Sequence, residues 1–206
     1  MKYFSTLQRI QSELEEIVFL EVKKNHLKAG PGSKEIRNFL ANLDIEAPDE
    51  VIEFYGEVHS FSIEWRAMKN SMAKYLKNEE LIAGRINILG LEQSLFGINK
   101  VKGWKDVIWY EDMESDDLEL CQSIHPFDFY FPDQGEMACF QILKNEINEK
   151  IFLYGDESSL CSMNMGIREY LDLLLQTKGM LFWQQSLIFG GEKKKQLEYY
   201  MPLLNR

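Results

Sequence analysis

Few residues of this chain have the types and spacing that chemistry requires, and the clearest pair is His125 with Asp128. An imidazole and a carboxylate can share a metal ion or exchange a proton. The residues around them have the pattern of a strand, and on a strand side chains three positions apart point to opposite faces. We therefore expect these two groups not to act together. A metal site would also lack a third ligand, since His26 and His59 lie in a predicted helical half.

The cysteines and glycines of the chain do not form a catalytic or cofactor-binding motif. Cys121, Cys139 and Cys161 are an odd number without a Cys-x-x-Cys pair, which is typical of reduced thiols and not of a disulfide framework or a zinc site. No Gly-x-Ser-x-Gly or phosphate-loop spacing occurs. The sequence therefore predicts a protein that is not an enzyme and has no cofactor. One alternative stays open, a hydrolase or metal-dependent enzyme built on His125 with Asp128.

One segment carries the whole net charge of the protein. From Asp106 to Leu143 there are ten Asp or Glu residues and no Lys or Arg, whereas the full chain has 33 acids, 23 bases and a net charge of −10. The rest of the chain therefore holds 23 acids (33 − 10) against 23 bases. The run 111–119 contains no glycine, which disfavours a calcium loop. Such a block of like charge is typical of a solvated loop or of a surface that binds a positive partner.

Aromatic residues on both sides of the acidic segment favour the partner surface. Interfaces combine aromatic anchors with a charged rim, although residues that alternate in a strand are also typical of a sheet core. Direct binding of nucleic acid or of an anionic membrane is disfavoured, because both need a positive protein surface. The candidate partner-binding residues are Glu111, Asp112, Glu114, Asp116, Asp117, Glu119, Asp133 and Glu136, with Trp104, Trp109, Tyr110, Phe127, Phe129 and Phe131 beside them.

Hydrophobic periodicity predicts the elements that position these groups. A helix is expected over 3–27, a second capped by Ser33, and a third after Pro48, with strands at 61–66, 84–89, 104–110, 124–131, 137–143 and 151–154, a turn at 132–135, and helices at 167–175, 181–188 and 193–200. This order indicates an α+β fold of one domain, residues 1–206, with N-terminal helices, a mostly antiparallel sheet of about 5–6 strands, and a closing C-terminal helix. No signal peptide or 18-residue apolar run is present, so we expect a cytoplasmic protein.

Several ordered motifs resemble the SUKH superfamily, which is named partly after a fungal cell-wall assembly regulator. They span about residues 45–185 and leave an N-terminal helical extension, 1–44, and a helical tail, 190–206. The family usually has Asn-Gly where this chain has His59-Ser60. The motifs are the helix 47–55 leading into 61–65, the strand 84–89 with Leu91-Glu92, Pro126-Phe127-Asp128, Ala138-Cys139-Phe140, and the helix 169–175 with Gly179 and Trp183-Gln184.

The resemblance implies an α+β fold without an active site. It also implies a bacterial immunity protein that neutralises a toxin, often a nuclease, or else a regulator or scaffold. A nuclease has a basic cleft, so the acidic face between Glu111 and Glu136 is predicted to dock a basic toxin domain. The alternative is a regulatory or scaffold module that binds an endogenous protein through the apolar sides of its terminal helices.

Overall fold

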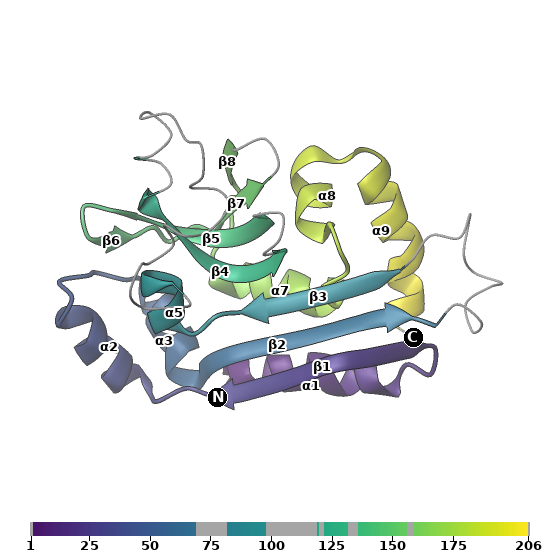
Figure 1. Ribbon diagram of the computed structural model, residues 1–206, viewed down its shortest axis with the longest axis horizontal. Helices are drawn as coiled ribbons and strands as arrows, with labels where there is room; N and C mark the ends of the chain where they lie inside the picture. Colours follow the sequence, from purple (N-terminus) through teal and green to yellow (C-terminus); the bar gives the residue numbers. More distant parts are fainter. Residues whose placement is uncertain are drawn as a thin grey trace.

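The computed structural model describes residues 2–68, 82–97, 119, 122–131, 136–155 and 159–205. Within these residues it contains seven helices and eight strands, an α+β fold (Figure 1). The helices are α1 (Lys2–Glu16), α2 (Ser33–Ala41), α3 (Asp49–Glu57), α5 (Leu91–Phe96), α7 (Ile167–Thr177), α8 (Trp183–Phe189) and α9 (Gly191–Leu204). The strands are β1 (Leu20–Ala29), β2 (Val58–Ala67), β3 (Ala83–Ile88), β4 (Ile124–Phe131), β5 (Glu136–Leu143), β6 (Glu146–Ile147), β7 (Phe152–Gly155) and β8 (Ser159–Ser162).

The strands form one antiparallel sheet in the order β1-β2-β3-β4-β5-β7-β8, with β6 paired to β5. The predicted class and the mostly antiparallel pairing are confirmed, although there are more strands than the 5–6 expected. β4 and β5 pair as the predicted hairpin, with Phe131 opposite Glu136. The predicted strand at 104–110 and the turn at 132–135 lie outside the described residues.

The first predicted helix is half wrong. α1 ends at Glu16, and residues 20–29 form strand β1, which pairs with β2 from Leu20 opposite Ala67 to Ala29 opposite Val58. Val18, expected on the apolar helix face, is 87% exposed. Pairing with β2 satisfies the backbone of this segment and overrides its local helical period. The N-terminal extension is therefore not purely helical, because it supplies a strand to the sheet.

The junction between α3 and β2 needs no glycine. α3 ends at Glu57, and Val58 is already extended with φ −125°. Neither His59 nor Ser60 has a positive φ, so the helix passes directly into the strand. One smaller expectation is corrected, because Ser33 is the first residue of α2 and makes no capping bond. Residues 159–162 form β8, which is not among the expected strands.

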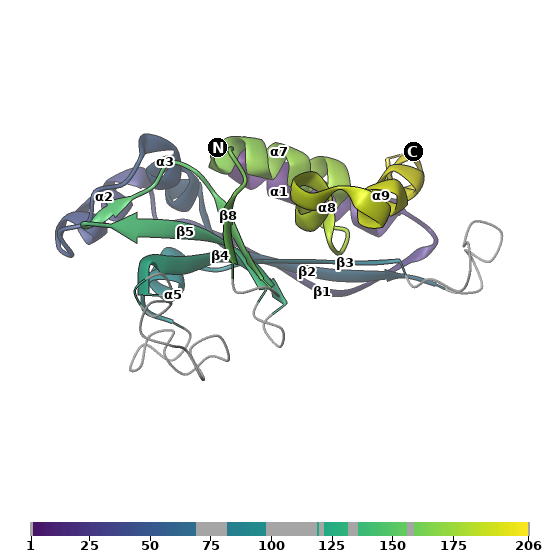
Figure 2. The same ribbon diagram turned by 90° about the horizontal axis from the view of Figure 1, so that it is seen from above.

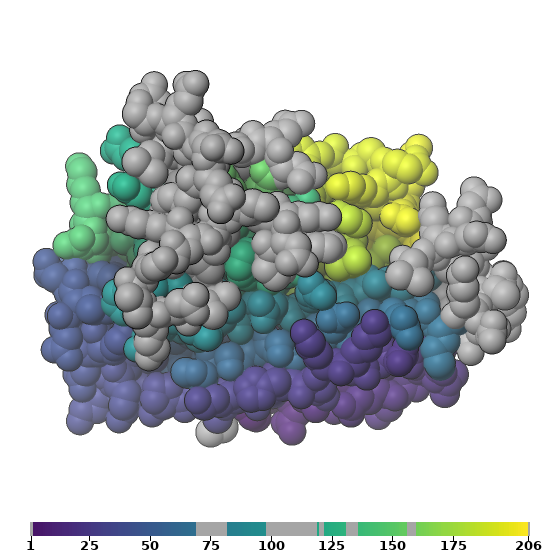
Figure 3. All heavy atoms as spheres, viewed as in Figure 1, coloured from purple at the N-terminus to yellow at the C-terminus, as the bar shows by residue number. Residues whose placement is uncertain are grey.

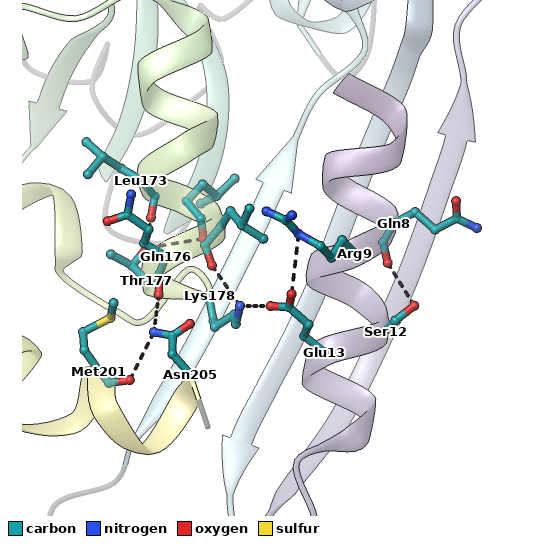
Figure 4. Close-up of polar contacts among 12 residues, drawn as sticks. Gln8, Arg9, Ser12, Glu13, Leu173, Gln176, Thr177, Lys178, Met201 and Asn205 are labelled. Carbon is teal, nitrogen blue, oxygen red and sulfur yellow. Dashed lines mark hydrogen bonds and ion pairs between the residues drawn. The ribbon is translucent and has the colours of Figure 1, made fainter. Parts of the chain in front are cut away.

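The main helices cover one face of the sheet. Figure 2 shows α1, α7, α8 and α9 on this face, with α5 on the opposite face against β4. The predicted alternation in β2 is confirmed, since Phe61, Ile63 and Trp65 are at most 1% exposed. Polar contacts join the helices, and Figure 4 shows Asn205, which directly follows α9, donating to the Gln176 carbonyl of α7. This hydrogen bond is 2.9 Å long.

Candidate protein-binding site

Among the described residues, Asp128 has the most deeply buried carboxylate. It lies on β4 with no exposed surface, and its two oxygens accept hydrogen bonds from the Asn87 backbone N–H at 2.7 Å and the Tyr170 hydroxyl at 2.8 Å. Gln184 of α8 in turn donates to the Tyr170 oxygen at 3.0 Å. Burial raises the pKa of Asp128 to about 6, and the two hydrogen bonds oppose this rise because they favour the charged form. The group therefore connects β3, β4, α7 and α8.

A second cluster attaches β2 and β3 to the end of α7. The Trp65 indole N–H donates to the Lys178 carbonyl at 2.7 Å, and both groups are buried. Gly84 faces this indole across the strand pair, and a Cβ there would stand 2.2 Å from Trp65 Cε2. Gly179 has φ +65°, and a Cβ there would stand 2.3 Å from Ile86. Both glycines are needed for the close approach of this turn to the sheet.

Residues from separate motifs of the sequence thus meet in the core. The Tyr170 and Trp183 rings pack with their centroids 5.0 Å apart, and Phe127 packs on Tyr170 at 5.4 Å. Asp128, Tyr170 and Gln184 are each at most 1% exposed. This arrangement holds the helices on the sheet, and the Asp128 carboxylate, the Tyr170 hydroxyl and the Gln184 amide N–H are used in internal hydrogen bonds.

His125 and Asp128 point to opposite faces of the sheet, as the strand pattern predicts. His125 Nδ1 lies 3.3 Å from the Ser94 carbonyl of α5, whereas Asp128 contacts Tyr170 of α7. Figure 2 shows α5 and α7 on opposite sides of the sheet. Burial lowers the pKa of His125, and hydrogen bonds to the α5 backbone partly offset this. The two side chains therefore cannot bind one ion or exchange a proton directly.

Most of the predicted acidic site lies outside the described residues. This applies to Glu111, Asp112, Glu114, Asp116, Asp117 and Asp133. Glu119 is exposed, as expected of a partner-binding residue. The segment 98–118 connects the end of α5 to the region before β4.

Glu136 requires a correction, because its side chain is not on the surface. It is 2% exposed, and the Gln185 amide of α8 donates to its Oε2 at 2.8 Å. Its position at the start of β5, under α8, removes it from water. Among the flanking aromatics, Phe127 and Phe129 are at most 2% exposed and belong to the core, which is the alternative that strand alternation favoured. Trp104, Trp109 and Tyr110 lie outside the described residues.

Sequence reasoning missed a polar face formed by β1, β2 and β3. A groove of about 290 Å³ crosses it, lined by Lys24, Ser62, Ile63, Glu64, Arg85, Ile86, Asn87 and Phe129. Arg85 pairs with Glu64 at 3.0 Å, and Arg66 pairs with Glu21 at 2.5 Å. In Figure 3, purple and blue atoms of these strands reach the surface in the lower part of the view. The signal in the sequence was the alternation of Ser62, Glu64 and Arg66. The contribution of β1 to this face was missed, because most of that segment was predicted as helix.

Within the described ranges, no three His, Cys, Asp or Glu side chains come together as a metal site. In the same ranges, no helix has the length and apolar character to cross a membrane. Comparisons with models of protein families, with curated proteins and with solved structures found no match to this chain. The assignment of a function therefore depends on the chain's own residues.

Proposed function

We propose that this chain is a cytoplasmic, non-enzymatic protein-binding domain of SUKH type, and more specifically an immunity protein that neutralises a basic toxin domain, such as a nuclease. The observation that carries the proposal is the concentration of the entire net charge of −10 between Asp106 and Leu143. The eight acids of this segment other than the buried Asp128 and Glu136 would attract a basic partner over distances of about a Debye length, near 10 Å, and orient it before contact.

The use of the other polar groups within the fold supports a binding role. Asp128 is bonded on both oxygens, and His125 is directed to the opposite face. The buried residues of the sequence motifs therefore stabilise the fold, while residues on the surface can contact a partner. This division is what a family of binding domains with different partners requires.

A net negative charge that is concentrated in one segment of the sequence is complementary to a basic partner domain. Electrostatic complementarity of this kind acts mainly on the association rate.

The test uses a secreted protein encoded beside this chain whose C-terminal domain is basic and toxic when expressed. Co-expression of this chain should restore growth, and the purified proteins should bind. The triple variant Glu111→Lys, Asp112→Lys, Glu114→Lys should slow association by about tenfold or more at low salt and flatten its salt dependence. The control Glu16→Lys, Asp172→Lys, Glu198→Lys changes the same charge at exposed sites elsewhere. Equal effects of both variants, or no protection by the wild type, would refute the proposal.

A regulatory or scaffold role is the second candidate, because the C-terminal helices expose apolar side chains. Leu187 and Phe189 of α8 are 44% and 64% exposed, and Tyr199 of α9 is 42% exposed. The apolar side of α1, in contrast, is buried through Leu7, Ile10 and Leu14, so deletion of residues 1–44 would remove core and would not test this role. The variant Leu187→Ser, Phe189→Ser tests it instead: loss of partner binding with toxin protection unchanged would favour the scaffold role.

A further inference from the structure

β1 is an edge strand of the described sheet and has an unusual charge for this protein. It stands at the end of the strand order and pairs only with β2 among the described strands. Together, β1, β2 and β3 carry five Lys or Arg residues and two Glu residues, a net charge of +3 in a chain of net charge −10. The bases are Lys23, Lys24, Lys28, Arg66 and Arg85, and the acids are Glu21 and Glu64.

Both acids of this face are already paired. Glu21 binds Arg66 at 2.5 Å, and Glu64 binds Arg85 at 3.0 Å and Lys23 at 4.0 Å. Lys24 and Lys28 are exposed, and in the described part of the chain no carboxylate lies within 4 Å of either ammonium group. The face therefore offers two cations that a ligand could neutralise.

The side chains of β1 alternate regularly between its two bulges. From Lys24 opposite Glu64 to Lys28 opposite Ser60, five residues keep an unbroken register with β2. Asn25 points to the helices, because its amide donates to Glu15 of α1 at 2.5 Å, and Leu27 packs against the core. Lys24, His26 and Lys28 therefore point to the other face, where Lys24 lines the groove.

We propose that this edge binds an extended acidic segment of a partner protein, which adds to the sheet beside β1. The backbone N–H and C=O groups of alternate β1 residues would pair with the segment. Asp or Glu residues at alternate positions would face Lys24, His26 and Lys28, and apolar residues between them would lie beside Leu27. The recognised pattern is thus acidic–apolar–acidic–apolar–acidic, with about five residues in contact, the length of the regular register.

Other occupants fit the same face less well. A second copy that pairs β1 with β1 would place lysines against lysines, and like charges directly opposite in a sheet are destabilising. A nucleic acid would be repelled by the net charge of the chain, and the groove places Glu64 where a phosphate would lie. Lysines on an edge strand also serve to prevent aggregation, and in that case the edge would bind nothing.

The experiment uses the full chain and a labelled peptide with Glu at three alternate positions and Val or Thr between them. Its controls are a peptide with Lys in place of Glu, and the acidic peptide N-methylated at the central residues, which keeps its charge but cannot pair with a strand. We expect saturable binding of the acidic peptide alone, with slower amide hydrogen exchange in β1. The variant Lys24→Glu, Lys28→Glu should weaken binding by about tenfold or more. The matched variant Lys194→Glu, Lys195→Glu on α9 should leave it unchanged.

Four results would overturn the proposal. The first is no saturable binding, which leaves the lysines as protection against aggregation. The second is equal binding of the N-methylated peptide, which means attraction without strand addition. The third is tighter binding of a single-stranded oligonucleotide that depends on Lys24 and Lys28. The fourth is self-association of the wild type that the Lys24→Glu, Lys28→Glu variant abolishes, which would make a second copy the occupant.

Discussion

The Tyr170 hydroxyl donates a 2.8 Å hydrogen bond to Oδ2 of Asp128, in the interior between α7 and β4. The Asn87 backbone N–H occupies the other carboxylate oxygen at 2.7 Å. Because the pKa of Asp128 is raised to about 6, the group is mostly charged at pH 7, and its two donors replace the water that burial removes. This bond is therefore an attachment point between the helical layer and the sheet.

Tyr170→Phe should lower the free energy of unfolding by about 2 kcal/mol at pH 7, because it removes one of two donors to a buried charge. It should also raise the pKa of Asp128 further, since the lost bond favoured the charged form. Urea denaturation measures the first effect. In an Asp128→Asn background the same substitution should cost less, because a neutral hydrogen bond is weaker. An equal cost in both backgrounds would mean that only ring packing is affected.

Asp128→Asn should change how stability depends on pH. The folded pKa, about 6, lies above the ordinary value of 3.8, so between these values the folded state binds more protons than the unfolded chain. Asp128 therefore lowers the free energy of unfolding as pH rises through this window, by up to about 3 kcal/mol for the 2.2-unit difference.

The expected observation is that wild type gains stability relative to Asp128→Asn as the pH falls from 6 to 4. Denaturation curves at several pH values measure this difference. Asp172→Asn, an exposed carboxylate on α7, is the control and should show little such change. His125 has a lowered pKa, so its own contribution to the free energy of unfolding falls as the pH drops. This contribution is common to wild type and Asp128→Asn, so it cancels when the two free energies are subtracted. Parallel curves for wild type and Asp128→Asn would contradict the buried-charge account.

Gly84→Ala should destabilise the protein by about 3 kcal/mol or more. A Cβ at this position would stand 2.2 Å from the buried Trp65 ring, which also holds the Lys178 carbonyl and cannot turn away. Gly155→Ala on β7 is a matched control, because its Cβ would meet Glu136 Cγ at an ordinary 3.5 Å. Thermal unfolding of both variants provides the comparison. Similar melting temperatures would show that Trp65 has room to move.

Glu13→Gln should cost about 1–2 kcal/mol, because it leaves the buried Lys178 ammonium without its carboxylate. Figure 4 shows this ammonium directed at Glu13 of α1. The ammonium also donates to the Leu175 carbonyl of α7 at 3.0 Å. Lys178 is 2% exposed, whereas Glu13 is 39% exposed, so solvent screening limits the effect.

The neighbouring pair supplies the control for this prediction. Arg9 also contacts Glu13, at 3.5 Å, but is 59% exposed, and Arg9→Gln should cost less than about 0.5 kcal/mol. Lys178→Met should lower the free energy of unfolding less than Glu13→Gln does, because it removes the buried charge and leaves no ammonium that needs a carboxylate. If Lys178→Met proves the more harmful of the two, the cost comes from the loss of the lysine and of its bond to the Leu175 carbonyl, and not from a buried charge without its carboxylate.

The sequence by itself determined the class of fold and most elements, because these depend on local period. The alternation around Ile63 and the helical stripe of α7 each place their apolar residues in the core as expected. It also predicted that His125 and Asp128 point to opposite faces, which the structure confirms although the register of β4 with β5 shifts between Pro126 and Asp128. The acidic segment is likewise a property of composition, and its role as a docking surface stays a prediction.

Only the tertiary structure decided which neighbours each residue has. Residues 20–27 fall within the predicted helix but belong to strand β1, because β2 offers partners for their backbone. Glu136 belongs to a charged stretch but is buried, because Gln185, 49 positions later, satisfies it. The Asp128–Tyr170–Gln184 cluster and the basic edge likewise unite residues far apart in the chain. Such contacts depend on how the helices and strands pack together, and they cannot be predicted from the local pattern of residues in the sequence.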